Sequence, residues 1–319
     1  MNFQEVVNGA KAAIARRVVG QEEMVHGLLM ALIAGGHILL EGVPGIAKTL
    51  AVKTLADVTG LLFKRIQFTP DLLPADLTGT LVWEQSTGVF SVRKGPIFAN
   101  VILADEINRA PAKVQSALLE AMEESQVTIG ETSYRLPEPF FVLATQNPIE
   151  HEGTYSLPEA ELDRFLMKFV VKYPTPDEEV KILYLVADKK EAQELPCVLN
   201  TAVLKMLRNA VENVYVDERI AAYMVSIAGA TRPAKTTREK EGVYKYVSFG
   251  ASPRASIALF RCSRIHALFD GRSFVTPDDV KAVAVPVLRH RIALSYEATA
   301  DGLDADAVVS RILSLVPVP

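Results

Sequence analysis

The sequence predicts an α/β domain with a parallel sheet, followed by an all-α domain. Short apolar runs alternate with helical patterns over the first half of the 319-residue chain, which is typical of parallel strands covered by helices on both faces. A glycine-rich loop follows the first run and opens a helix. From about Tyr173 onward, helical patterns continue without a convincing strand. We therefore expect residues 1–174 to form the α/β domain and residues 175–319 the helical domain.

The first elements frame the glycine-rich loop. Residues 3–34 show helical spacing in two blocks, which VVGQ at 18–21 separates. The apolar run at 37–41 is typical of a buried strand, and the helical pattern at 49–60 ends at a glycine. The order is therefore strand, loop, helix.

Four later apolar runs are expected to join the same sheet. They occupy residues 63–68, 100–104, 140–145 and 167–171. The segment 111–125 predicts a helix between the second and third of these strands, with Pro111 at its first position.

Two segments interrupt this alternation. In residues 79–98 apolar residues flank the polar turn QSTG, and in residues 126–136 VTI and YRL flank GETS. Both patterns predict β-hairpins inserted into the α/β domain, the second more clearly than the first.

The second domain begins where the prolines and acidic residues of YPTPDEE, at 173–179, mark a helix start. Its helical patterns are interrupted at 231–253, and TPDDV at 276–280 marks a later helix start.

Charge, the lengths of the apolar runs and the cysteine spacing restrict the functions that this chain can have. A net charge of −4 gives no overall attraction to nucleic acid. No segment approaches 18 uninterrupted apolar residues, and the N-terminus lacks the apolar core of a signal peptide. Cys197 and Cys262 have no metal-ligand spacing, so we expect buried thiols. These features predict a cytoplasmic protein that neither inserts into membranes nor binds nucleic acid.

The loop GVPGIAKT at 42–49 differs by one residue from the phosphate-binding pattern G-x-x-x-x-G-K-[ST]. Backbone N–H groups of such a loop and of the next helix hold phosphate, Lys48 would reach the β- and γ-phosphates, and Thr49 would bind Mg²⁺. Ala47 replaces the last glycine, and its methyl group costs little if the backbone there is already helical. The alternative is an ordinary glycine-rich turn. We assign the ATP phosphates to Gly42, Val43, Pro44, Gly45, Ile46, Ala47, Lys48, Thr49 and Leu50.

Polar residues end two of the predicted strands. VILADE closes with Asp105, a candidate Mg²⁺ ligand, and Glu106, which could polarise the attacking water. A strand-terminal acid pair can also be a solvated turn, but its position after a phosphate loop favours the catalytic interpretation. Asn147 could orient the water or sense the γ-phosphate, or simply form a turn before Pro148.

Two arginines are candidates for stabilising the transferred phosphoryl group. Arg164 precedes the last predicted strand, and Arg254 begins a helix of the second domain. An arginine at the γ-phosphate accelerates hydrolysis by about 10³ to 10⁵. A surface ion pair is the alternative for each.

Six segments together resemble the MoxR family of AAA+ ATPases over almost the whole chain. They are GVPGIAKT, QFTPDLLPADLTG, GPIFANVILADEINRAP, ALLEAMEE, ATQNPIEHEGTYSLPEAELDRF and GASPRA. The resemblance implies a P-loop AAA+ core with inserted hairpins and an all-α lid, and the family carries alanine at the position of Ala47.

The resemblance also implies residue roles. Gly20 and Gln21 would lie near the adenine, Lys48 and Thr49 form the Walker A pair, and Asp105 and Glu106 the Walker B pair. Asn147 matches sensor 1, Arg164 the arginine finger and Arg254 the sensor 2 arginine. The two hairpins match the helix-2 insert and pre-sensor-1 hairpin of the clade that includes magnesium chelatase, where such hairpins often face a central pore.

Three functions are compatible with these features. The first is an ATPase that works as a ring, hexameric by resemblance, and matures a client protein, often one with a von Willebrand factor A domain. The second is a nucleic-acid motor, but the hairpins offer only Arg93, Lys94 and Arg135 as cations, against Glu84 and Glu131. The third is a scaffold that binds ATP to assemble and hydrolyses little.

Overall fold

The computed structural model describes residues 2–42, 45, 48–148, 154–187, 194–233 and 242–319. Contacts divide the chain into two compact units. The α/β unit comprises Asn8–Arg164 and Phe169–Leu204, and the helical unit comprises Met1–Val7, Phe165–Lys168 and Lys205–Pro319.

The α/β unit is built on a parallel sheet. Its five strands have the order β2-β5-β8-β1-β9, and the register of β2 with β5, β5 with β8 and β8 with β1 is parallel throughout. Interior strands are almost entirely apolar and buried, as expected for a sheet covered on both faces. The strands are β1 (Ile38–Glu41), β2 (Phe63–Gln67), β5 (Val101–Asp105), β8 (Phe141–Gln146) and β9 (Met167–Val170).

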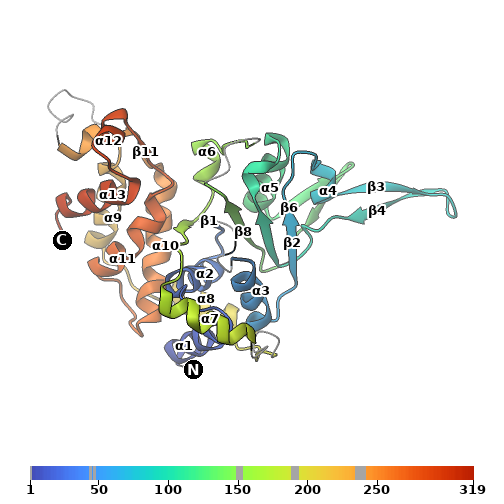
Figure 1. The fold of residues 1–319 in the computed structure, drawn as a ribbon, viewed down its shortest axis with the longest axis horizontal. Coiled ribbons are helices and arrows are strands. Elements are labelled where there is room, and N and C mark those ends of the chain that lie inside the picture. Colours follow the sequence, from blue (N-terminus) through green and yellow to red (C-terminus); the bar gives the residue numbers. More distant parts are fainter. Residues whose placement is uncertain (1, 43–44, 46–47, 149–153, 188–193, 234–241) are drawn as a thin grey trace. The chain divides into compact units, whose positions relative to one another are not determined.

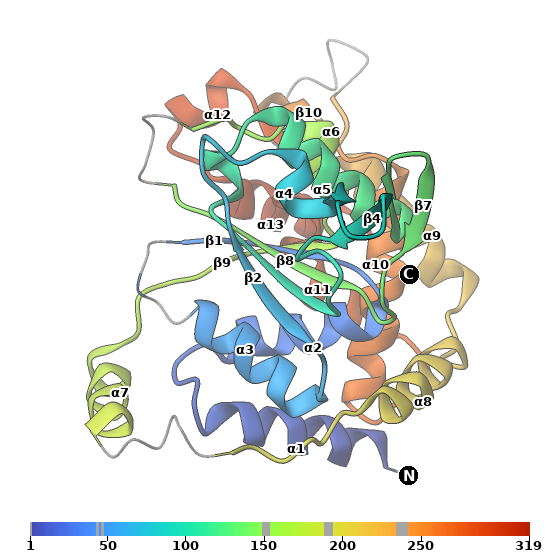
Figure 2. The same cartoon turned by 90° about the vertical axis from the view of Figure 1, so that its right-hand side faces the viewer.

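Helices cover both faces of this sheet. Figure 2 shows α2 and α3 on one face and α4 and α5 on the other. The predicted helix at 111–125 is present, but Pro111 is its N-cap residue and Ala112 its first helical residue. The helices that precede β9 are α1 (Phe3–Ala15), α2 (Glu22–Ala34), α3 (Lys48–Thr59), α4 (Pro74–Thr78), α5 (Ala112–Glu124) and α6 (Glu159–Leu162), with a 3₁₀ turn η1 (Ile107–Arg109) after β5.

Both predicted hairpins are present. The first pairs β3 (Gly79–Glu84) with β4 (Val89–Lys94), and the second pairs β6 (Gln126–Ile129) with β7 (Thr132–Arg135). In Figure 1 the ribbon of β3 and β4 extends away from the sheet of its unit.

The helical unit contains two short strands that the sequence did not predict. Val247–Phe249 (β10) pairs with Ala293–Leu294 (β11) in an antiparallel ribbon with an irregular register. Strands of two or three residues are too short to show periodicity, which explains the omission. The helices after β9 are α7 (Pro176–Ala187), α8 (Thr201–Glu212), α9 (Glu218–Ala230), α10 (Pro253–Phe269), α11 (Pro277–Leu288), α12 (Tyr296–Ala300) and α13 (Ala305–Leu315), with a 3₁₀ turn η3 (Gly242–Tyr246) before β10.

Two further predictions from composition can be compared with the structure. Cys262 is buried as expected, but Cys197 is exposed, so that expectation was wrong for one thiol. The reason is local, because Cys197 lies in an irregular segment before α8 and not on the buried face of a helix or strand. None of the helices in the described part of the chain is long and apolar enough to cross a membrane.

His37, just before β1, makes the stability of the α/β unit sensitive to acid. Its Nε2 atom donates to the Met122 carbonyl oxygen at 3.1 Å, and its Nδ1 atom accepts the Val142 N–H at 3.0 Å. A second proton would break the latter bond. Burial lowers the pKa of His37 from 6.5 to about 4, partly opposed by the hydrogen bond to Met122.

Because the folded-state pKa lies below the unfolded one, His37 protonates more readily in the unfolded chain. Its contribution to stability is complete above pH 6.5 and is lost as the pH falls towards 4. Between pH 7 and pH 5 we expect a loss of about 2 kcal/mol from this residue. Urea unfolding at both pH values should show a smaller loss for His37→Gln, whose amide can keep both hydrogen bonds. Parallel pH profiles for the two proteins would contradict the assignment.

Candidate functional site

The carboxyl ends of β1, β5 and β8 surround a cavity of about 370 Å³. Ligands of open α/β sheets bind at this edge of the strands. The lining residues are Gly45, Lys48, Thr49, Leu50, Arg65, Asp105, Glu106 and Asn147. All of them except Arg65 were predicted from the sequence, so the structure brings the separate motifs of the loop, the acid pair and the amide together.

The phosphate loop joins β1 to α3. Gly45 has φ +87°, a conformation that glycine adopts freely and other residues rarely do. The Lys48 Nζ atom donates to the Gly42 carbonyl oxygen at 2.6 Å, so the side chain reaches back to the residue that directly follows β1. Burial lowers the pKa of Lys48, and the nearby charges of Asp105 and Glu106 oppose this shift. The predictions for Val43, Pro44, Ile46 and Ala47 lie outside the described residues.

The acid pair is held by a buried hydroxyl. The Thr145 Oγ1 atom donates to Asp105 Oδ1 at 2.6 Å and accepts the backbone N–H of Glu106 at 2.8 Å. Glu106 itself has φ 57°, a left-handed conformation that is uncommon for a glutamate. The chain therefore turns sharply at the end of β5, and both carboxylates line the cavity.

The edge strand β2 contributes two residues that sequence reasoning missed. Arg65 donates to Asp105 Oδ2 from Nε at 3.0 Å and from Nη2 at 2.5 Å. Gln67 donates from Nε2 to Glu106 Oε2 at 2.8 Å, and Arg109 donates to the same oxygen at 3.2 Å. The polar side chains at 65 and 67, on either side of the buried Ile66, were the feature of the sequence that could have indicated a role for β2. Only the strand order shows that these side chains lie next to Asp105 and Glu106.

The donor set suits a magnesium ion with a nucleotide. Carboxylate and hydroxyl oxygens are the protein ligands that Mg²⁺ prefers, with phosphate oxygens and water completing its shell. Asp105 and Thr49 provide such oxygens at one cavity, beside the ammonium group of Lys48. The residues present are therefore suited to hold a magnesium ion together with a nucleotide.

Asn147 lies directly after β8 and is 6% exposed. It lines the cavity with Lys48 and Glu106, so its amide is placed for contact with a phosphate or a water molecule. Gly20 and Gln21 are not among the described residues that line this cavity. Gln21 instead donates to the Lys172 carbonyl oxygen at 3.2 Å, and a Cβ on Gly20 would lie 2.7 Å from the Glu178 carboxyl carbon. Their proximity to adenine remains a prediction.

Arg164 lies at a different place on the α/β unit. It lines a hollow of about 310 Å³, and none of the described residues lines both this hollow and the phosphate-loop cavity. Its Nη1 atom is 2.7 Å from Glu123 Oε2 and donates to the Leu119 carbonyl oxygen at 3.0 Å. The structure therefore does not bring Arg164 together with Lys48 and Glu106 in one cavity of the same chain.

Arg254 belongs to the helical unit. It is exposed in the first turn of α10, where its backbone N–H donates to the N-cap Ser252 hydroxyl at 3.0 Å. Proline at the first position and serine at the cap explain why the helix begins there. The role of Arg254 at a nucleotide remains a prediction.

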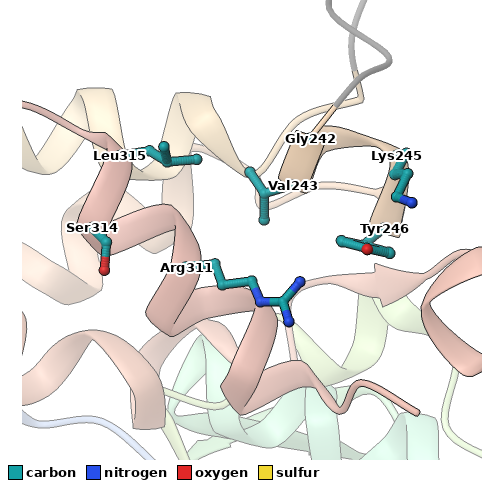
Figure 3. Close-up of a pocket in the computed structure, with 7 residues that line it drawn as sticks. All are labelled: Gly242, Val243, Lys245, Tyr246, Arg311, Ser314 and Leu315. Atoms are coloured by element: carbon teal, nitrogen blue, oxygen red, sulfur yellow. The ribbon is translucent and has the colours of Figure 1, made fainter. Parts of the chain in front are cut away.

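A larger cavity, of about 660 Å³, lies in the helical unit, and its described lining includes none of the predicted site residues (Figure 3). There the Lys245 Nζ atom lies 4.7 Å, and the Arg311 Cζ atom 5.6 Å, from the centroid of the Tyr246 ring. The Tyr246 hydroxyl donates to Asp301 at 2.8 Å. The phosphate-loop cavity is therefore chosen as the candidate site because of its chemistry and not because of its size.

Comparison with known protein families agrees with the fold. The family model of the ATPase family associated with various cellular activities (AAA) matches residues 37–167, and the AAA lid domain model matches residues 240–312. The α/β unit with its phosphate loop and the helical unit thus define an AAA+ protein.

Relatives specify the family within this class. Chaperone MoxR1 of Mycobacterium tuberculosis is 48% identical, over 96% of this chain and 80% of the relative. Protein MoxR of Methylorubrum extorquens is 31% identical, over 96% of this chain and 93% of the relative. The solved structure of a proposed ATPase from Cytophaga hutchinsonii, 45% identical, superposes with a TM-score of 0.91 and covers 99% of this chain and 96% of that one. The chain belongs to the MoxR family of AAA+ ATPases, which confirms the resemblance and the predicted fold class.

Proposed function

We propose that this protein hydrolyses ATP to ADP and phosphate as part of a ring of identical subunits, and that it uses this cycle to remodel a partner protein. The observation that carries the proposal is the convergence of Lys48, Asp105, Glu106 and Asn147 on one cavity. These residues follow the ends of three different strands and still line the same cavity. A surface hollow without a function would not be expected to gather them.

The loop and the acid pair have distinct roles in this proposal. Backbone N–H groups of the loop and the Lys48 ammonium group bind the phosphates of ATP. Thr49 and Asp105 would hold Mg²⁺, which would neutralise charge on the β- and γ-phosphates. Glu106 accepts hydrogen bonds from Gln67 and Arg109, so its carboxylate is oriented and can polarise the attacking water. Asn147 positions that water or the γ-phosphate.

Assembly into a ring is supported by the location of Arg164. This arginine lies away from the phosphate-loop cavity of its own chain. We propose that it completes the site of a neighbouring subunit, in a hexamer as the family resemblance suggests. Identical subunits that contact each other through two different surfaces form closed rings when the rotation between them closes. Arg254 would act from the lid, in cis or on a neighbour.

The first hairpin is the proposed client-contact element. Trp83 lies opposite Phe90, and Leu81 lies opposite Val92, so these four residues occupy one face of the ribbon. The Trp83 and Phe90 rings meet edge to face with centroids 5.0 Å apart, yet they are 52% and 65% exposed. Exposed apolar clusters of this kind mark protein contacts. A relative is named as a chaperone, and the family resemblance suggests clients with a von Willebrand factor A domain.

Measuring Mg²⁺-dependent ATP hydrolysis per subunit over a dilution series of the protein tests the function. We expect activity per subunit to rise steeply with protein concentration, because an isolated subunit lacks the arginine of its neighbour. Size-exclusion chromatography on the same samples should place the rise at the concentration where a ring forms. ATP binding without turnover in the assembled ring would favour the scaffold alternative. Constant turnover per subunit through dissociation would contradict sites shared between subunits.

A further inference from the structure

The guanidinium group of Arg65 lies where a metal cation would approach Asp105. Both of its hydrogen bonds to this side chain reach the same atom, Oδ2, at 3.0 and 2.5 Å. The other carboxylate oxygen, Oδ1, accepts from the Thr145 hydroxyl at 2.6 Å. Both oxygens of the proposed magnesium ligand are therefore occupied by donors of the chain itself.

The two partners of this ion pair differ in how freely they can move. The Asp105 side chain is 14% exposed and is fixed by Thr145, whereas the Arg65 side chain is 50% exposed. Arg65 extends from β2, the first strand in the sheet order, and its Nη2 atom also donates to Gln67 Oε1 at 2.9 Å. The arginine can therefore leave the carboxylate without disturbing the sheet, and Gln67 offers it a second acceptor.

Charge supplies the reason for such a pair. Asp105 and Glu106 are adjacent carboxylates at one cavity, and unpaired like charges at short distance repel each other. Arg65 and Arg109 each neutralise one of them. A metal ion bound at Asp105 would supply the same neutralisation, so the guanidinium group and the metal compete for one oxygen.

We propose that Arg65 is a cationic placeholder for the magnesium ion: it pairs with Asp105 while the site holds no metal, and it leaves Oδ2 when the metal enters with the nucleotide. The inference rests on the proposed nucleotide site. Arg65 is thus a positioning residue, which neutralises the Asp105 carboxylate between cycles and sets the Mg²⁺ concentration at which the site fills.

The test measures binding rather than turnover. A fluorescent ADP analogue is bound to the full-length protein in EDTA and then at increasing Mg²⁺ concentrations. Arg65→Gln removes the competing charge and keeps an amide near Gln67, and Arg65→Lys keeps the charge without the forked donor. The matched control is Arg219→Gln, which removes an exposed arginine paired with Asp217 in the helical unit. Thermal melts identify any variant that does not fold.

For Arg65→Gln we expect the half-saturating Mg²⁺ concentration to fall by about twofold to fivefold, because a partly exposed ion pair no longer competes. Arg65→Lys should lie between Arg65→Gln and the wild type, and Arg219→Gln should match the wild type. An unchanged Mg²⁺ dependence in folded Arg65→Gln would overturn the placeholder role. So would weaker analogue binding in EDTA with no change in Mg²⁺ dependence, because Arg65 would then bind phosphate. Wild-type binding that does not depend on Mg²⁺ would also overturn the placeholder role, whereas failure of the wild type to bind the analogue at any Mg²⁺ concentration would contradict the nucleotide site itself.

Discussion

Replacing Glu106 by glutamine is expected to slow ATP turnover by on the order of 10² to 10⁴, the usual contribution of a general base, while leaving nucleotide binding intact. The Glu106 carboxylate can take up a proton from the attacking water, whereas the amide of a glutamine cannot. Glutamine has the same shape, and its carbonyl oxygen can still accept from Gln67 and Arg109, which now donate to Glu106 Oε2 at 2.8 and 3.2 Å. The fold and the phosphate loop should therefore be unaffected.

Single-turnover hydrolysis and equilibrium binding of ATP, measured on the same preparation, separate chemistry from binding. Glu131→Gln is a suitable control, because Glu131 is exposed in the turn between β6 and β7. We expect the control to hydrolyse ATP at the wild-type rate. If Glu106→Gln also kept its turnover, Glu106 would have no part in the mechanism, and the glutamate would be a structural turn residue.

The parts of the fold that the sequence predicted well share a physical cause. Short continuous apolar runs such as 100–104 and 140–145 form buried strands because a parallel sheet covered on both faces pairs their backbone groups and removes their side chains from water. The hairpin at 126–136 followed from its turn residues and alternation. The ribbon of β10 and β11 was missed because two or three residues carry no period, and Cys197 was placed in the core because thiols usually are buried.

The site shows a similar division. Lys48, Asp105 and Asn147 were predicted because each lies at the end of a strand or at the start of a helix, where local sequence patterns are easiest to recognise. Arg65 and Gln67 were missed because their relevance depends on which strand neighbours β5, and local sequence does not encode strand order. Once Gln67 is known to lie opposite Asp105 in the register, the contact between β2 and the acid pair follows. Contacts across a sheet therefore require the fold, whereas motifs along the chain do not.

Replacing Arg164 by alanine should reduce the activity of the assembled protein by about 10³ to 10⁵, the range for an arginine that stabilises the transferred phosphoryl group. The effect on stability should be small. Arg164 forms an ion pair with Glu123, and the two side chains are 32% and 45% exposed. Exposed ion pairs contribute about 0 to 1 kcal/mol to the stability of the fold. ATP binding in the variant should remain close to that of the wild type. Arg219→Ala, which removes an exposed arginine paired with Asp217, should leave the activity unchanged.

Mixing two inactive variants determines which subunit uses Arg164. An Arg164→Ala subunit keeps its own Glu106, and a Glu106→Gln subunit keeps its own Arg164. If Arg164 acts on a neighbour, some interfaces in a mixed ring combine the intact Glu106 of one variant with the intact Arg164 of the other. In rings of randomly mixed subunits this holds for roughly a quarter of the interfaces at equal amounts, so activity should return well above that of either variant alone. If Arg164 acted within its own chain, every site in the mixture would lack one of the two groups, and the mixture would stay inactive. Recovery of activity therefore requires a site that contacting subunits share, because neither variant subunit holds a complete set of catalytic groups.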